Sequence, residues 1–142
     1  MSKGIPEGHL AFDSSVLTEM LNGTELGSEL TDTLLNGGII AHTSFINVAE
    51  AEYVLCRKIG HPNARKKVED LLASAYVSVE EDPTLHAIAS EMKCVRAISL
   101  ADCYTFAVAK VTSSKPVFVL KEDELLKEMN RRPFETQPIF LT

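Results

Sequence analysis

The stretch Leu10-Ala11-Phe12-Asp13-Ser14-Ser15 constrains the fold of this chain more than any other segment. It indicates a short apolar strand that ends in a carboxylate and turns at once into a helix. Strands of a parallel sheet are buried on both faces, so they form brief apolar runs rather than alternating patterns. In open α/β sheets, ligands bind beyond the carboxyl ends of the strands, where the strand order reverses. Asp13 is therefore the first residue at which we expect chemistry.

The rest of the chain alternates between apolar runs and helical patterns. The further expected strands cover residues 39–42, 76–79, 116–120 and 138–141, and the expected helices cover about 16–22, 25–36, 45–59, 61–72, 83–95, 100–111 and 124–129. Such alternation predicts a parallel sheet with right-handed crossovers and helices on both faces. We expect an α/β fold, a three-layer α/β/α sandwich with a mostly parallel central sheet, in a single domain over residues 1–142.

Charge and cysteine content limit the function and the compartment. The chain has 20 acidic and 14 basic residues, and a formal net charge of −6 argues against nucleic-acid binding by charge alone. That objection weakens if several carboxylates hold divalent cations, which invert the local charge. Three widely spaced cysteines predict no disulfide framework and so a reducing cytoplasm. We see no signal peptide and no apolar run of the roughly 18 residues that a membrane helix needs, so no membrane is expected as a partner.

Four acids fall where strands end or helices begin. Asp13 ends the first strand and Asp123 lies three residues after the strand that ends at Leu120. Glu50 lies in the second turn of the helix that follows the second strand, and Asp102 in the first turn of a later helix. Strand ends and helix starts share one edge of a doubly wound sheet, so all four are expected to face one crevice. Converging carboxylates repel one another unless a cation holds them, and hard oxygen ligands suit Mg²⁺ or Mn²⁺. Such a site activates water and stabilises charge on a phosphodiester.

Each acid also has a purely structural explanation. Asp13 can cap a helix, and Ser99-x-x-Asp102 resembles a capping box. Asp123 belongs to the run Glu122-Asp123-Glu124, which favours a helix N-terminus electrostatically. Glu50 lies off the apolar stripe of its helix and can be solvated. These explanations are independent of one another, whereas a metal site explains all four positions together.

Helical periodicity favours Glu52 rather than Glu50 as the acid with a function. The expected apolar stripe of that helix comprises Phe45, Val48, Ala49, Leu55, Cys56 and Ile59. Glu52 lies in the middle of this stripe, and a carboxylate on a buried face needs a partner or a ligand. The alternative is that Glu52 lies at the rim of the sheet and reaches solvent or a nearby arginine.

Four segments together resemble the acidic motifs of PIN domains. They are Phe12-Asp13-Ser14-Ser15, Ser44-Phe45-Ile46-Asn47-Val48-Ala49-Glu50, Ser99-Leu100-Ala101-Asp102 and Val117-Phe118-Val119-Leu120-Lys121-Glu122-Asp123. The order of helices and strands matches as well, and the length is similar to that of small VapC-type toxins. The resemblance implies an Mg²⁺- or Mn²⁺-dependent ribonuclease that cuts RNA, with Asp13, Glu50, Asp102 and Asp123 as metal ligands and catalytic acids. It also implies a homodimer and a small antitoxin whose tail enters the acidic crevice.

The resemblance decides some points and leaves others open. It favours Glu50 over Glu52, which remains a possible accessory residue, and it matches Ser14 or Ser15 to a hydroxyl that orients the first carboxylate. Lys121 departs from the family, which often has Thr or Ser there, so the alternative is an inactive PIN-like module that binds RNA or a protein. The expected phosphate contacts are basic residues, although a solvated helix face is the more ordinary role for most of them. They are Arg57, Lys58, Arg65, Lys66, Lys67, Lys93 and Arg96.

Two other chemistries on α/β folds are disfavoured by the pattern of acids and by Lys115-Pro116, which precedes its strand. A receiver-type phosphorylation switch needs an acceptor Asp at the end of the third strand, where this chain has Glu80-Glu81, and a Lys-Pro after its last strand. Haloacid-dehalogenase-type phosphatases need Asp-x-Asp at the first strand, and Asp13-Ser14-Ser15 lacks the second Asp.

Overall fold

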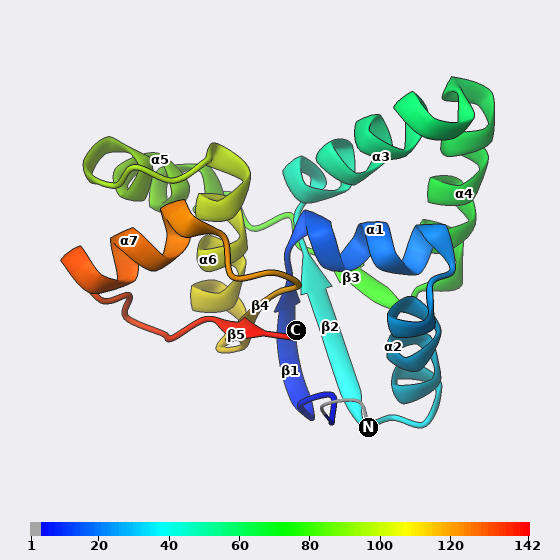
Figure 1. Cartoon of the computed structure of the whole chain (residues 1–142), viewed down its shortest axis with the longest axis horizontal. Coiled ribbons are helices and arrows are strands. Elements are labelled where there is room, and N and C mark those ends of the chain that lie inside the picture. The colour runs from blue at the N-terminus through cyan, green and yellow to red at the C-terminus, as the bar shows by residue number, and fades with distance from the viewer. Residues whose placement is uncertain (1–3) are drawn as a thin grey trace.

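A computed structural model describes residues 4–142 of the chain. Its strands form one parallel sheet of order β3-β2-β1-β4-β5 (Figure 1). The strands are β1 (Gly8–Phe12), β2 (Ile39–Thr43), β3 (Val77–Val79), β4 (Lys115–Phe118) and β5 (Ile139–Phe140). The predicted parallel sheet is confirmed.

The strand order places the reversal of the chain next to β1. From β1 the chain moves outward through β2 to β3, and then returns to pair β4 on the other side of β1. Phe12 is in register with Val117, and the Asp13 N–H donates to the Val117 carbonyl at 3.0 Å. Asp13 therefore leaves the sheet at the switch point, where α/β folds bind their ligands.

Helices cover both faces of the sheet (Figure 1). They are α1 (Ser14–Asn22), α2 (Glu25–Leu35), α3 (Phe45–Ile59), α4 (His61–Ser74), α5 (Leu85–Val95), α6 (Leu100–Thr112) and α7 (Asp123–Arg131). Buried side chains of α1 to α4 share one core cluster with Leu10 and Phe12, and those of α5 to α7 share a second cluster with Ala11. Because neighbouring strand residues point to opposite faces, β1 contributes to both cores. The predicted three-layer α/β/α architecture is confirmed.

The buried face of α3 differs from the predicted stripe. Phe45 is 53% exposed and Ala49 is exposed, whereas Asn47 is fully buried. Counting back from Leu55 in helical steps leads to the buried positions Ala51, Val48 and Asn47 rather than to Phe45. A polar residue thus occupies the inner face of the helix, while the apolar side chains of its first turn face outward. The pattern of apolar residues alone did not reveal how the helix is rotated about its axis.

Helix α5 and the last strand are shorter than predicted. Asp82 does not cap α5, which begins at Leu85 after Thr84. Its carboxylate instead accepts hydrogen bonds from the backbone N–H and the hydroxyl of Thr84, at 2.8 and 2.6 Å, and so closes the preceding turn. At the C-terminus only Ile139 and Phe140 pair in register with β4.

Helices α1 and α2 approach so closely that Gly27 has no room for a side chain. A Cβ built on Gly27 would lie 2.1 Å from the backbone oxygen of Glu19. We expect Gly27→Ala to lower the free energy of unfolding by about 1–3 kcal/mol, because overpacking against a backbone outweighs the better helix propensity of alanine. Urea unfolding would measure the loss, with Ser28→Ala on the exposed side of the same helix as the control. A Gly27→Ala variant as stable as the wild type would contradict the close contact.

Two further observations concern membrane helices and cysteines. Among residues 4–142, no helix is both long and apolar enough to cross a membrane. Cys56, Cys94 and Cys103 are free thiols, and Cys103 is buried in the core.

Candidate active site

Asp13 begins α1 as its N-cap and lies nearly buried, with 6% of its surface exposed. One carboxylate oxygen accepts hydrogen bonds from the backbone N–H and the hydroxyl of Ser15, at 3.0 and 2.7 Å. The other accepts one from the Thr105 hydroxyl at 3.1 Å. All three donors are neutral, so they orient the carboxylate without cancelling its charge. Of the two serines considered from the sequence, Ser15 is the one whose hydroxyl holds Asp13.

Asp102 lies in the first turn of α6, where Ser99 caps the helix by accepting a hydrogen bond from the Asp102 N–H at 3.1 Å. Its side chain is subject to burial and to the charges of other acids. Burial, followed by the negative charges of Asp13 and Glu122 and then that of Glu50, raises the pKa of Asp102 to about 7. The structure therefore places Asp13, Glu50 and Asp102, three of the four acids expected to face one crevice, close enough for their charges to act on Asp102.

Glu122, an acid that the sequence did not single out, also lies within reach of the charges of Asp13 and Glu50. Glu122 is the N-cap residue of α7, and Asp123 is the first residue of the helix. Partial desolvation and the charges of Asp13, Glu124 and Glu50 raise the pKa of Glu122. Asp123 is not among the acids that act on Asp102. Spacing alone could not separate the two neighbours, because they stand in one acidic run.

Glu50 and Glu52 have different surroundings. Glu52 forms an ion pair with Arg65 at 3.0 Å, which is the structural alternative that the sequence left open for it. The charge of Glu50 contributes to the raised pKa of both Asp102 and Glu122. Glu50 thus belongs to the acidic cluster, while Glu52 is compensated by a neighbouring helix.

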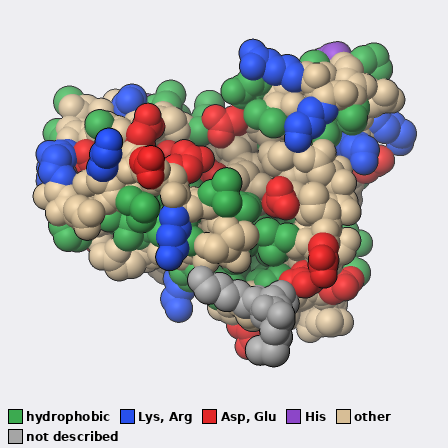
Figure 2. All heavy atoms as spheres, in the orientation of Figure 1, with side chains coloured by type: hydrophobic (Ala, Val, Ile, Leu, Met, Phe, Trp, Pro, Cys, Tyr) green, Lys and Arg blue, Asp and Glu red, His purple; other side chains and the backbone are tan. Residues whose placement is uncertain are grey.

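The chemistry of these donors fits a divalent cation. Within the described residues, none of Asp13, Glu50, Asp102 and Glu122 forms an ion pair with a basic side chain. Figure 2 shows acidic side chains around the hollow between the α3 side of the molecule and the side formed by α5 to α7. In residues 4–142 no three acidic, His or Cys side chains lie close enough together to hold a metal ion as they stand. The fit to a cation therefore rests on the chemistry of the donors: the carboxylates act on one another through their charges, and hard oxygen donors of this kind suit Mg²⁺ or Mn²⁺.

Most of the basic residues considered as phosphate contacts have structural partners instead. Three of them form ion pairs: Arg65 with Glu52, Lys66 with Asp70, and Arg96 with the buried Glu128. Lys67 and Lys93 donate hydrogen bonds to backbone carbonyls. The Arg57 guanidinium lies over the ring of Tyr53. These contacts favour the ordinary role that the sequence allowed for them.

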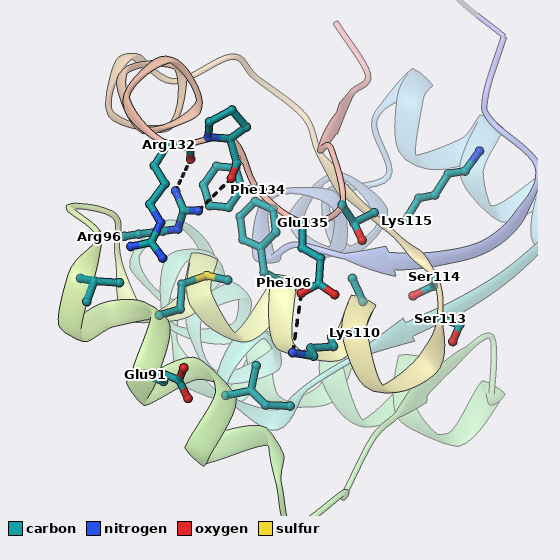
Figure 3. Close-up of a pocket in the computed structure, with 16 residues that line it drawn as sticks. Glu91, Arg96, Phe106, Lys110, Ser113, Ser114, Lys115, Arg132, Phe134 and Glu135 are labelled. Atoms are coloured by element: carbon teal, nitrogen blue, oxygen red, sulfur yellow. Dashed lines mark hydrogen bonds and ion pairs between the residues drawn. The ribbon is translucent and has the colours of Figure 1, made fainter.

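A cavity of about 740 Å³ lies between α5, α6 and residues 132–136 (Figure 3). The Arg96 guanidinium lies 4.1 Å from the centre of the Phe134 ring, which stacks on Phe106 at 4.0 Å. Lys110 and Glu135 form an ion pair at 3.6 Å beside it. None of the acids of the cluster lines this cavity. The acidic site is an open crevice at the sheet edge, separate from it.

Comparisons with known proteins agree with the fold and with the predicted family. The model of the PIN domain matches residues 10–131. VapC20 from Mycobacterium tuberculosis, described as a sarcin-ricin loop cleaving toxin, superposes with a TM-score of 0.63 at 18% identity, covering 84% of this chain and 93% of that one. VapBC2 from Rickettsia felis, bound to a DNA fragment from their promoter, superposes with a TM-score of 0.66 at 13% identity, covering 95% of this chain and 99% of that one. A comparison with curated proteins finds no match. Since the family model spans most of the chain, this protein belongs to the PIN domain family.

Proposed function

We propose that this protein is a divalent-cation-dependent endoribonuclease and the toxin of a toxin–antitoxin pair. The observation that carries the proposal is the cluster of uncompensated carboxylates at the switch point of the sheet, with the pKa of Asp102 raised to about 7. Acids that repel one another in this way without basic neighbours are arranged for a cation. VapC20, which has the same fold, is described as a sarcin-ricin loop cleaving toxin, and this supports RNA as the substrate proposed for this chain.

Asp13, Glu50 and Asp102 would hold Mg²⁺ or Mn²⁺, and the fourth carboxylate would come from the Glu122-Asp123 pair. A cation bound there would activate a water molecule and neutralise the charge that develops on the phosphodiester. Ser15 and Thr105 hold the Asp13 carboxylate in one orientation before any ligand arrives. Because Asp102 must lose its proton to become a ligand, its raised pKa makes cation binding weaker below about pH 7.

The first experiment is cleavage of a structured RNA by the purified protein with Mn²⁺, with Mg²⁺ and with a chelator. We expect cleavage with either cation and none with the chelator. A calorimetric titration with Mn²⁺ separates the proposal from the alternative of an inactive module that binds RNA or a protein. That alternative is favoured by Lys121, which is exposed and stands where family members often have Thr or Ser. A protein that binds no Mn²⁺ at millimolar concentration could hardly be a nuclease.

The two candidates for the fourth acid make a matched pair of variants. The family motif favours Asp123, and the charge coupling to Asp13 and Glu50 favours Glu122. We expect Glu122→Gln to reduce Mn²⁺-dependent cleavage by about 10-fold or more, and Asp123→Asn to reduce it less, because only the first removes a charge that acts on the cluster. The cleavage rates of both variants, each compared with the wild type, decide between them. A larger loss in Asp123→Asn would assign the position to Asp123.

We also propose that the chain forms a homodimer in the cytoplasm and binds a small antitoxin. Exposed apolar side chains of α3, namely Phe45, Ile46 and Tyr53, offer a surface for a protein partner. Light scattering of the purified chain would give its mass in solution, and a monomer at micromolar concentration would contradict the dimer. A short reading frame immediately upstream, encoding a DNA-binding head and a disordered tail, would identify the antitoxin.

A further inference from the structure

A series of buried hydrogen bonds connects Asp13 to the interiors of α3 and α6. Asn47 on α3 and Thr105 on α6 are both 0% exposed, which is uncommon for an asparagine. The Asn47 side-chain amide donates to the Thr105 hydroxyl oxygen at 3.0 Å and to the Ala101 carbonyl at 3.1 Å. The Thr105 hydroxyl in turn donates to the Asp13 carboxylate at 3.1 Å. Residues 58 positions apart thus meet behind the acid that anchors the site.

The donors in this series all point toward the carboxylate. The Ser44 hydroxyl accepts the Asn47 backbone N–H at 3.1 Å and gives its own proton to the Asn47 side-chain oxygen at 2.6 Å. The amide oxygen therefore faces Ser44, and the amide NH₂ must face α6. The Thr105 hydroxyl has one proton and two acceptors within reach, the Asp13 carboxylate at 3.1 Å and the Ala101 carbonyl at 3.2 Å. Because the Ala101 carbonyl also accepts a proton from Asn47 and a charged carboxylate is the stronger acceptor, the Thr105 proton is directed at Asp13.

The same residues join the two helices that carry the other acids. Asn47 lies three residues before Glu50 on α3, and Thr105 lies three residues after Asp102 on α6. Positions three apart lie on neighbouring turns of the same helix side. The hydrogen bond between Asn47 and Thr105 therefore holds α3 and α6 together within one turn of both carboxylates. These helices belong to opposite layers of the sandwich and meet here, beyond the edge of the sheet.

Packing alone does not account for two polar residues at this place. Replacing both partners of a buried hydrogen bond by apolar groups of similar shape is nearly neutral for stability, so leucine and valine would serve an ordinary core equally well. A hydroxyl and an amide have the additional property of fixing a direction and a distance. Their neighbours in the series are the acid Asp13 and the helix turns that carry Glu50 and Asp102.

We propose that Asn47 and Thr105 are positioning residues, which set the orientation of Asp13 and the separation of α3 and α6 and thereby the affinity of the crevice for a divalent cation. The inference rests on the proposed function of this site. Neither residue touches the substrate or the reacting atoms. They act through Asp13, Glu50 and Asp102, in the way that hydrogen-bond partners behind metal ligands orient those ligands.

The test compares Thr105→Val with Thr105→Ser in the full chain. Calorimetric titration with Mn²⁺ gives the Kd, and thermal unfolding in a chelator gives the stability without cation. We expect Thr105→Val to weaken Mn²⁺ binding by about 10- to 100-fold, the usual cost of losing a partner behind a metal ligand. We expect Thr105→Ser, which keeps the hydroxyl, to bind Mn²⁺ like the wild type. With RNA present, Thr105→Val should lower kcat at saturating Mn²⁺ with little change in KM for the RNA.

Thr43→Val is the matched control. Thr43 is 1% exposed, and its hydroxyl donates to the Phe12 backbone carbonyl at 3.0 Å rather than to a carboxylate. The Thr43→Val variant should lose about as much stability as Thr105→Val and should keep the Mn²⁺ affinity of the wild type. If Thr105→Val fails to fold, the double variant Asn47→Leu/Thr105→Val replaces it, because it removes both partners of the Asn47–Thr105 hydrogen bond and does not leave the Asn47 amide facing an apolar side chain.

The outcomes separate this inference from the proposed function. Wild-type protein that neither binds Mn²⁺ nor cleaves RNA overturns the proposed function, and this inference with it. Wild-type protein that binds Mn²⁺ while folded Thr105→Val or the double variant binds equally well overturns this inference alone. Equal losses of affinity in Thr105→Val and Thr43→Val would also overturn it, since they would reduce the effect to general destabilisation.

Discussion

Replacing Asp13 by Asn is expected to lower the Mn²⁺-dependent cleavage of RNA by at least about 100-fold, more than the loss of a partner behind a metal ligand. Asp13 stands at the switch point of the sheet and is held by neutral donors only, so its charge remains available to a cation. Asparagine has nearly the same shape and caps helices as well as aspartate does. The variant therefore removes the charge while keeping the start of α1.

The measurement is the initial rate of RNA cleavage at saturating Mn²⁺, together with the melting temperature. Asn offers one acceptor oxygen where Asp offers two, so either Ser15 or Thr105 loses its acceptor, and we expect a stability loss of about 1 kcal/mol. Asp32→Asn, an exposed acid on α2, controls for the change of net charge. Cleavage at the wild-type rate in a folded Asp13→Asn variant would remove this residue from the site.

Replacing Asp102 by Asn is expected to stabilise the protein above neutral pH when no divalent cation is present. The pKa of Asp102 is raised in the folded state to about 7 from an ordinary 3.8, by burial and by the charges of Asp13, Glu122 and Glu50. Between these values the folded protein keeps a proton that the unfolded chain releases. The contribution of Asp102 to stability is therefore present below about pH 4 and is lost as the pH rises through 7. Each pKa unit corresponds to about 1.4 kcal/mol, and partial solvent screening limits the total to about 2–4 kcal/mol.

Urea unfolding in a chelator at about pH 5 and about pH 8 would measure this effect. The quantity to compare is the difference between wild type and variant at each pH, because other carboxylates titrate in the same range. We expect Asp102→Asn to gain stability over the wild type at pH 8 and to gain much less at pH 5. Added Mn²⁺ should raise the melting temperature of the wild type and leave the variant nearly unchanged, since a ligand of the native state stabilises it by mass action. If the free energy of unfolding of Asp102→Asn and of the wild type changed equally with pH, the pKa of Asp102 would not be raised in the folded protein.

The two variants are expected to change stability in opposite directions. Asp13→Asn should lower the stability slightly, whereas Asp102→Asn should raise the stability of the cation-free protein. Carboxylates crowded at one edge destabilise a protein while no cation is bound, and the same crowding is what binds the cation. A site retained only for folding would not crowd Asp102 with Asp13, Glu122 and Glu50 while, in the described residues, none of them forms an ion pair with a basic side chain. The expected gain in stability of Asp102→Asn, with loss of cleavage, is the pattern of a site that trades stability for activity.

The sequence by itself determined the layer architecture, the parallel sheet and the edge at which Asp13, Glu50 and Asp102 lie. These features depend on local signals: apolar runs for buried strands, helical periodicity, and caps such as Ser44 and Ser99, each of which acts within a few residues. Only the tertiary structure showed that Glu52 pairs with Arg65, that Glu122 joins the acidic cluster, and that Asn47 reaches Thr105. Each of these depends on how a helix is rotated and on distances between elements remote in the chain, and periodicity fixes a helix only to within about one residue on its circumference. The buried polar contacts behind Asp13 were therefore beyond the reach of the sequence, although the carboxylate that they hold was not.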